Sequence, residues 1–589
     1  MRLLVSLLMT VSLYAQPGFF PLADVRPGMQ GIGKTVFSGD RIEEFQLDIL
    51  GVLENAGPRQ SLILARLSGG PLATTGVLQG MSGSPVYIGG RLVGAVAMTF
   101  AFSKEPIAAI RPIQDLISAG ETTPERRLRA RASLTDTDLT QGFEPSEAIL
   151  AGGAKLVDIA TPVSFSGFTE STLRHFAPQL RNLGLEPQQG LSGGGRLKTG
   201  FGDPKALEPG SMISVELLAG DMSVGADGTL TYIDGNRVYA FGHRFLAMGS
   251  TDIPFARSDV LTLVPNLSSS FKISTPREWM GSITSDRSTG VAGVLGRQAA
   301  LIPVSISVTP RSSGGAAGNR MLYEMQMVND SVLSPLLVQM AFYSTVDATE
   351  RTVGSSTLAI RGEIQFEGNT APIRLSNTVA GDLSLPQLAS LSAASPLAYA
   401  LQSGFEGLRR LKEIKIDIDS YPERRDARID QVWTSRRDVR PGETVDLHVA
   451  LAGPNGIETT RGVSYLVPVG AATGPLYFTV ADGSTTNTTE FRQLLTTPPR
   501  SSSQLVSFLN ALRDNTKAYV RIWRPQPDFD VMGQSFPSPP PSVEQILARS
   551  QAGLGATMIS RNSKVGELEI DAGGMVVSGS KTIQVEVKE

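Results

Sequence analysis

Short runs in which apolar and polar residues alternate, with glycine turns between them, recur along most of this chain and limit what it can fold into. Residues 42–52 alternate in the way that a half-buried strand does. Residues 86–88 and 92–96 flank Gly89-Gly90, and a two-residue glycine turn between apolar runs favours a β-hairpin. Asp234-Gly235 separates a second pair of such runs. The pattern predicts a mainly β protein.

Helical patterns are fewer. Apolar residues recur at helical spacing over residues 170–183, which end before Gly184, and this predicts an amphipathic helix. Further helices are expected near residues 332–343 and 385–412. With 589 residues, the chain is too long for one hydrophobic core, so we expect several structural units.

The first residues, MRLLVSLLMTVSLYAQ, have the layout of a secretory signal peptide. One positive charge precedes an apolar run over residues 3–13, and Ala15 is a small residue that suits cleavage. The alternative is a buried first strand. No later run approaches the ~20 apolar residues of a membrane-spanning helix. We therefore expect an exported protein, periplasmic or extracellular, without an integral membrane span.

Composition excludes several kinds of chemistry. The chain has no cysteine, so disulfides, thiolate catalysis and cysteine-ligated metals are excluded. A net charge of −3 gives no overall attraction to nucleic acid. No two of the three histidines stand at metal-ligand spacing, and residues 31–35 lack the first glycine of a phosphate-binding loop. We expect neither a metal nor a cofactor.

Of the three histidines, His243 stands in the most suggestive place. It follows an apolar run that ends at Gly242, and side chains at strand ends next to glycine loops are held on a rigid base. His175 lies beside the apolar stripe of a predicted helix and His448 lies in an alternating strand, so both are interpreted as surface residues.

The segment Gly80-Met81-Ser82-Gly83-Ser84-Pro85 favours serine chemistry. A serine hydroxyl needs a neighbouring base to remove its proton, and backbone N–H groups directed at the developing oxyanion. The two glycines permit a tight turn that presents such N–H groups, although an ordinary turn before a hairpin would also use them. Neither Ser82 nor Ser84 has glycine both two residues before it and two residues after it, as the nucleophile elbow of α/β-hydrolases requires. It looks like the Gly-x-Ser-Gly-x-Pro turn of chymotrypsin-like proteases, in which Ser82 would be the nucleophile.

Together with residues 37–52 and 91–96, this segment resembles the SpoIVB-type serine peptidase family of the chymotrypsin-like clan. Residues 228–232 and 240–243 resemble the same family. The resemblance implies a serine endopeptidase that acts on a protein or peptide substrate. It implies Ser82 as nucleophile, His243 as general base, and the backbone N–H groups of Gly80 and Ser82 as the oxyanion hole.

The chain departs from the family in two ways. The serine block precedes the histidine block here, whereas the order is reversed in the sporulation peptidase; geometry rather than chain order defines such a site. The family's acidic residue falls on residues 67–69, where no carboxylate stands. Asp234 and Asp252 lie near His243 in sequence and are candidates to orient its ring. A Ser–His dyad, a relocated third residue and a decayed site all remain open.

We therefore expect a mainly β fold with some α: a two-lobed, chymotrypsin-like β-barrel peptidase region followed by a C-terminal β-sandwich-like module. The expected function is an exported serine endopeptidase, of narrow specificity or self-processing. The alternative is a catalytically silent scaffold or binding protein of the cell envelope, which would meet an envelope-protein partner through the C-terminal β module. The expected divisions are a signal peptide (1–15), a serine-bearing lobe (16–130), a mixed connector (131–205), a histidine-bearing lobe (206–370), a helical connector (371–412), the β-sandwich-like module (413–500), and a helix, a Pro-rich linker and terminal strands (501–589).

Overall fold

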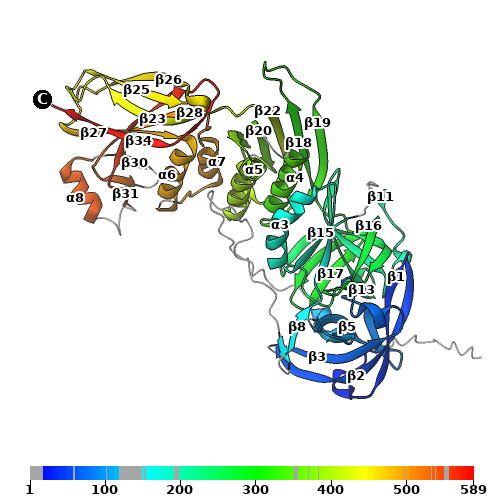
Figure 1. Ribbon diagram of the computed structural model, residues 1–589. Helices are drawn as coiled ribbons and strands as arrows, with labels where there is room; N and C mark the ends of the chain where they lie inside the picture. Colours follow the sequence, from blue (N-terminus) through cyan, green and yellow to red (C-terminus); the bar gives the residue numbers. More distant parts are fainter. Residues whose placement is uncertain are drawn as a thin grey trace, which may run out of the picture.

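The structure is a computed structural model, and it shows an elongated molecule with β-rich parts arranged from one end to the other (Figure 1). The N-terminal part lies at one end, and the C-terminal part lies at the other. No helix among the described residues is long and apolar enough to cross a membrane. The structure describes residues 18–57, 60–100, 102–118, 149–151, 154–190, 198–349, 356–368, 370–382, 384–496, 498–531, 534–537, 539–549 and 556–589.

The N-terminal part is a closed antiparallel barrel. Its strands are joined in the order β1-β2-β3-β6-β5-β4, and β4 pairs back onto β1. The alternation in β2 places Phe45, Leu47 and Ile49 in the barrel core. The Gly89-Gly90 turn joins β4 and β5 as predicted, with both glycines at positive φ. The strands are β1 (Gln30–Ser38), β2 (Arg41–Gly57), β3 (Gln60–Ser68), β4 (Pro85–Ile88), β5 (Arg91–Phe100) and β6 (Ile107–Pro112).

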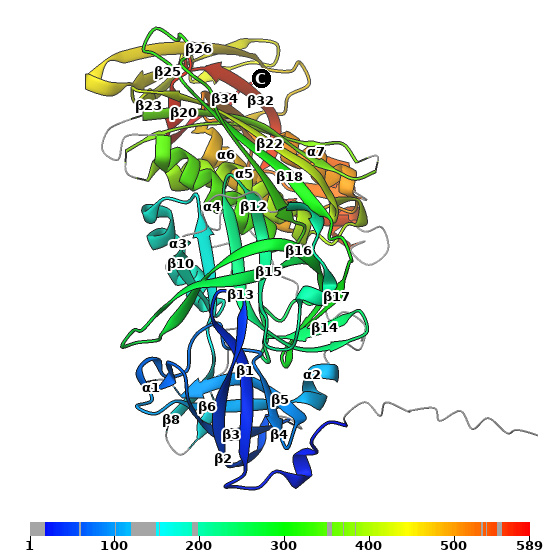
Figure 2. The ribbon, with the colours of Figure 1, turned by 90° about the vertical axis from the view of Figure 1, so that its right-hand side faces the viewer.

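A second closed antiparallel barrel follows, with the same strand order. Its strands are joined as β12-β13-β14-β17-β16-β15, and β15 pairs back onto β12. The barrels lie against each other, the second above the first in Figure 2. The strands are β12 (Met212–Gly220), β13 (Ser223–Asp234), β14 (Arg237–Ala240), β15 (Gly249–Val264), β16 (Phe271–Arg287) and β17 (Gly290–Leu295).

Smaller elements lie around the two barrels. Strand β8 pairs with β5 of the first barrel, whereas β9 pairs with β13 of the second. The chain therefore crosses from one barrel to the other between these two strands. These elements are α1 (Leu72–Thr75), α2 (Ile113–Ser118), β7 (Ile149–Ala151), β8 (Ala154–Asp158), β9 (Thr161–Ser166), β10 (Leu185–Gln189) and β11 (Lys198–Phe201).

The second barrel continues into a sheet covered by helices. Strand β19 pairs with β12, and β18, β22, β20 and β21 follow it outward, so that one hydrophobic core runs through both parts. The helix predicted over 170–183 is α3 (Glu170–Asn182), and the one predicted near 332–343 is α4 (Leu333–Thr349). The helix predicted over 385–412 is shorter, α5 (Leu385–Gln402), because Gly404 at positive φ ends it. The strands are β18 (Leu301–Pro310), β19 (Met321–Val328), β20 (Ser356–Phe366), β21 (Ile373–Gly381) and β22 (Leu411–Tyr421).

The C-terminal part is a sandwich of two sheets, β26-β25-β23-β33 and β24-β34-β27-β28-β32, around a core of their inward side chains. Strand β22 crosses the expected boundary at 412/413 and pairs with β18 and β20, so the sandwich begins with β23. Its elements are β23 (Asp426–Thr434), β24 (Asp438–Val439), β25 (Thr444–Ala452), β26 (Glu458–Leu466), β27 (Gly474–Asp482), α6 (Gly483–Thr496), α7 (Ser502–Asn510), β28 (Lys517–Arg524), β32 (Ser563–Asp571), β33 (Val576–Ser578) and β34 (Ser580–Val587).

These elements confirm the expected fold class, which is mainly β with a two-barrel region and a C-terminal sandwich. The Pro-rich linker expected over residues 535–542 overlaps a short strand, β30 (Gln534–Pro537), and the start of a helix, α8 (Pro541–Arg549). The expected signal peptide, the basic stretch 121–133 and most of the glycine-rich stretch 190–195 lie outside the described residues.

Candidate active site

Ser82 and His243 occupy equivalent places in the two barrels. Ser82 lies between β3 and β4, and His243 lies between β14 and β15; each therefore follows the third strand of its own barrel. Because the two barrels share one strand order, these two connections occupy the same position in each barrel, although they are far apart in the sequence.

The serine turn is shaped by two glycines. Gly80 and Gly83 adopt φ values of +89° and +91°, which side chains with a Cβ rarely adopt. Within the turn, the N–H groups of Met81, Gly83 and Ser84 donate to backbone carbonyls at 2.7–3.1 Å. Among the described residues, no backbone carbonyl outside the helices and strands accepts the N–H groups of Gly80 and Ser82, the expected oxyanion donors.

This turn packs directly against the second barrel. The N–H of Thr229 on β13 donates to the Ser82 carbonyl at 2.8 Å, and the Thr229 hydroxyl donates to the Gly80 carbonyl at 2.9 Å. The Thr231 hydroxyl donates to the Gly83 carbonyl at 2.7 Å. A Cβ at Gly83 would lie 2.5 Å from the nitrogen of Phe241, two residues before His243. The structure therefore brings the serine segment and the histidine segment together.

The ring of His243 is buried, with 2% of the residue exposed. Its Nδ1 lies 2.7 Å from the Arg244 carbonyl oxygen. A carbonyl can only accept, so Nδ1 carries the proton and Nε2 of the neutral ring is left as the acceptor. Nε2 and the hydroxyl of Ser82, which is fully buried, have no hydrogen-bond partner in the described part of the chain. The two atoms come from adjoining segments, but they are not hydrogen-bonded to each other.

Burial is the main influence on the charge of this histidine. It lowers the pKa of His243, whereas the charge of Asp158 and the Arg244 carbonyl raise it, and the charges of Arg111 and Arg244 lower it further. Asp158 ends β8, and the next residue, Ile159, donates its N–H to the Ala97 carbonyl on β5. Burial thus favours the neutral ring, which is the form that can accept a proton.

Of the two carboxylates proposed to orient the ring, Asp252 is bound to other groups. Asp252 accepts from the Ser282 hydroxyl at 2.7 Å and from the Ala300 N–H, and it pairs with Arg297. Asp234 lies at the end of β13 opposite Arg237 in the hairpin.

Asp286 is a residue that sequence reasoning missed. It is buried near the end of β16, and its carboxylate accepts the N–H groups of Phe245, Leu246 and Met248 at 2.8, 2.7 and 3.2 Å. These three residues lie in the segment that follows Arg244. Burial raises the pKa of Asp286 to about 6, against the lowering effect of the three N–H groups. Asp286 thus fixes the loop whose Arg244 carbonyl orients the His243 ring. Nothing local in the sequence marks it.

A buried polar cluster lies behind the serine turn and was also missed. The Lys272 stem lies 3.2 Å from the position that a Cβ on Gly80 would take, and its Nζ donates to the Thr35 hydroxyl of the first barrel at 2.8 Å. Burial lowers the pKa of Lys272 to about 7, and the charge of Asp227 opposes this shift. Burial raises the pKa of Glu216 to about 8. Lys272 therefore joins the two barrels directly beneath Gly80.

The other histidines lie on aromatic rings. His175 stacks on Tyr343 with ring centroids 5.0 Å apart, and His448 stacks on Trp433 at 5.5 Å. Both are half-buried. Within the described ranges, no group of three or more His, Asp or Glu side chains is arranged to hold a metal ion.

Two six-stranded antiparallel barrels with matching strand order, joined across a serine turn, define the two-barrel class of peptidase folds. Residues 21–108 match the family model described as SpoIVB peptidase S55, and this confirms the resemblance to the SpoIVB-type serine peptidase family. The match contains Ser82 and ends at the start of β6, before His243. It supports a serine peptidase in general. No curated protein and no solved structure matched the chain.

Proposed function

We propose that this protein is an exported serine endopeptidase that uses Ser82 as nucleophile and His243 as general base. The observation that carries the proposal is the His243 ring, whose Nδ1 proton is held by the Arg244 carbonyl while Nε2 stays available. His243 comes two residues after Phe241, whose backbone lies against Gly83 of the serine turn.

In the proposed reaction, the Ser82 hydroxyl attacks the scissile carbonyl and its proton passes to Nε2 of His243. The negative oxygen of the tetrahedral intermediate is received by the N–H groups of Gly80 and Ser82. The imidazolium then gives its proton to the leaving amine, and an acyl group remains on Ser82. Water, deprotonated by the same Nε2, hydrolyses this ester and restores the hydroxyl. Each step uses groups of this chain and water.

The missing family carboxylate is replaced in part by the Arg244 carbonyl and by the charge of Asp158, which raises the pKa of His243. The Arg244 carbonyl fixes the tautomer of His243, and Asp286 holds the loop that carries this carbonyl. A carbonyl dipole stabilises the imidazolium less than a carboxylate would, and loss of the triad aspartate in a protease costs ~10⁴-fold in turnover. We therefore expect a slow enzyme.

Burial of the site supports a narrow substrate specificity. Ser82 is fully buried and its hydroxyl is not hydrogen-bonded to Nε2, so a substrate must open the contact between the barrels before the reaction. Such a requirement suits a peptidase of narrow specificity or one that processes itself. The burial of Ser82 also suits the second candidate, a catalytically silent scaffold of the cell envelope that contacts an envelope protein through the C-terminal sandwich.

Labelling with an active-site serine phosphonate separates the two candidates. We expect the wild-type chain and Ser84→Ala to be labelled, and Ser82→Ala and His243→Ala to remain unlabelled. Ser84 is the matched control, because it is a fully buried serine with an unpartnered hydroxyl two residues away. Equal labelling of all four proteins, or of none, would remove the enzyme and favour the scaffold. Export is tested separately, by the N-terminal mass of the protein recovered outside the cytoplasm, which should begin at Gln16.

A further inference from the structure

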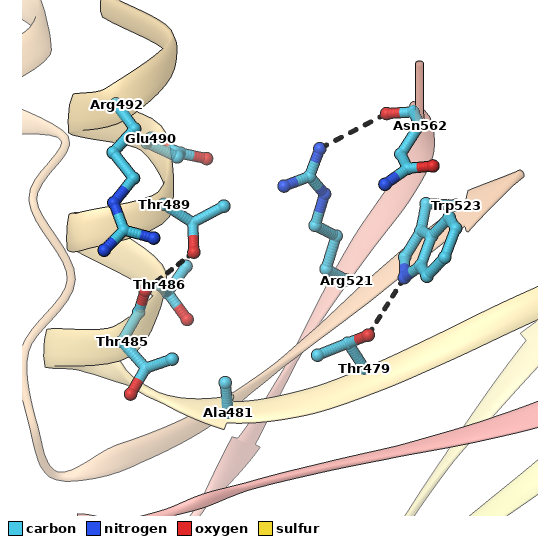
Figure 3. A pocket seen from close by; sticks show the side chains of 10 residues that line it. All are labelled: Thr479, Ala481, Thr485, Thr486, Thr489, Glu490, Arg492, Arg521, Trp523 and Asn562. Carbon is cyan, nitrogen blue, oxygen red and sulfur yellow. Dashed lines mark hydrogen bonds between the residues drawn. The ribbon is translucent and has the colours of Figure 1, made fainter. Parts of the chain in front are cut away.

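A hollow of about 400 Å³ lies in the C-terminal sandwich, between α6 and the outer face of β27 and β28 (Figure 3). Its volume falls in the range of small-ligand sites. Arg521 and Trp523 of β28 stand on one side of it and the polar face of α6 on the other. The lining residues are Thr479, Ala481, Thr485, Thr486, Thr489, Glu490, Arg492, Arg521, Trp523 and Asn562.

Two of the three carboxylates whose charges act on Arg521, those of Glu490 and Glu567, are held by other cations. Arg513 donates to the carboxylates of Glu490 and Glu567 at 2.9 and 2.8 Å, and Lys564 pairs with both carboxylates as well. These two cations and two anions form a closed group without net charge. The guanidiniums of Arg521 and Arg492 are additional to it.

Arg521 has hydrogen-bonding capacity that the protein does not use. Its Nε–H is buried and has no acceptor among the described residues, and one terminal nitrogen makes a long 3.5 Å bond to the Asn562 carbonyl. Burial lowers the pKa of Arg521, while the charges of Glu490, Glu567 and Asp528 raise it. A buried donor without an acceptor is costly, so an entering acceptor would be favoured.

The remaining polar groups of the hollow are mostly occupied. The hydroxyl of Thr486 donates to the carbonyl of Asp482 at the end of β27 at 2.8 Å, and that of Thr489 to the Thr485 carbonyl of α6 at 2.9 Å. The Thr479 hydroxyl accepts from the Trp523 indole at 2.9 Å. What these residues offer a ligand is their methyl groups, the Cβ of Ala481 and the indole ring. A sugar with many hydroxyls would find few free partners, whereas an apolar body would be well accommodated.

We propose that this hollow binds a carboxylate carried on a small apolar body, with the carboxylate on Arg521 and the body between Trp523 and the threonine methyls of α6. A planar guanidinium can bind both oxygens of a carboxylate. This chemistry is shared by the C-terminal residue of a peptide and by a short free acid. The proposal does not depend on Ser82 or on catalysis.

Isothermal titration calorimetry on the full chain tests the proposal, in the Ser82→Ala background so that no probe is cleaved. The probes are N-acetyl-L-alanyl-L-alanine, its C-terminal amide, hexanoate and glucuronate. We expect the peptide acid, hexanoate or both to bind, and which of them binds identifies the source of the carboxylate. The amide should bind at least tenfold more weakly, because it lacks the charge.

Variants locate the site. Arg521→Gln should lose at least tenfold in affinity. Arg521→Lys should also weaken binding, because lysine keeps the positive charge but lacks the planar guanidinium that binds both carboxylate oxygens. Arg492→Gln, at an exposed position, should weaken binding without affecting folding. Arg440→Gln, an exposed arginine elsewhere in the sandwich, is the matched control and should bind like the parent. Equal binding of acid and amide, equal affinity of all variants, binding of glucuronate alone, or no binding of any probe would each overturn the proposal.

Discussion

Replacing Gly83 with alanine tests whether the serine turn is held by its contact with the second barrel. The matched control is Gly89→Ala in the first barrel's hairpin. Both glycines have positive φ, +91° and +56°, so both substitutions strain the backbone. A Cβ at Gly89 would enter open space, whereas one at Gly83 would lie 2.5 Å from the Phe241 nitrogen and still closer to the Thr229 carbonyl oxygen.

The different space around the two glycines determines how much each substitution lowers the free energy of unfolding. Backbone strain alone costs about 1 kcal/mol, and this is the whole cost expected for Gly89→Ala. The methyl at Gly83 adds an overlap with two backbone atoms that cannot rotate away, and this overpacking costs about 1–3 kcal/mol more because the barrels must separate. Near 2–4 °C per kcal/mol, the unfolding temperature of the barrels should fall by about 10 °C in Gly83→Ala and about 3 °C in the control.

Differential scanning calorimetry measures the two shifts, and hydrogen–deuterium exchange assigns them to a region. Exchange should accelerate in β4, β5 and β13 of Gly83→Ala, because those strands carry the inter-barrel contact. Equal shifts for the two variants, or unchanged exchange in β13, would refute the close approach.

Three further predictions concern ionisable groups. Because burial lowers the pKa of His243, the acidic limb of kcat/KM against pH should have its midpoint below 6.5; a midpoint above 6.5 would contradict a buried base. Glu216→Gln should gain stability relative to the wild type as pH rises from 4.5 to 8, by about 1.4 kcal/mol per pH unit. The reason is that folded wild-type protein keeps a proton on Glu216 that the unfolded chain releases. Parallel curves of unfolding free energy against pH would disprove this. Asp286→Asn should lower kcat/KM at least tenfold and speed amide exchange at residues 245–248. Unchanged exchange at these residues would show that Asp286 does not hold the loop.

Local signals in the sequence predicted local structure well. The Gly89-Gly90 turn predicted a hairpin, and the apolar stripe of residues 170–183 predicted α3, because each depends on neighbouring residues. The helix predicted over 385–412 was too long, since apolar residues continue into β22 after Gly404. The closure of each barrel was expected only through the family resemblance, because β4–β1 and β15–β12 pair residues distant in sequence.

The candidate site was predictable only in part. The Gly-x-Ser-Gly turn and the glycine before His243 are local features, and both stand where the two barrels meet. Asp286 could not be found in this way, because it acts on Phe245 from 41 residues away and through backbone N–H groups. Lys272 likewise reaches Thr35 across 237 residues. A lysine in an alternating run is ordinarily exposed, and only the packing of two barrels buries this one.

Strand β34 (Ser580–Val587) is an interior strand of its sheet and pairs with β24 on one side and β27 on the other. A nascent chain that has not yet released residues 580–587 from the ribosome would present the edge of β27 and an uncovered set of core side chains. The sandwich must therefore close after synthesis has passed these residues, while both barrels can assemble earlier. Premature stop codons near position 580 should yield chains that are cleared by proteases, even though every residue of the serine and histidine turns is present.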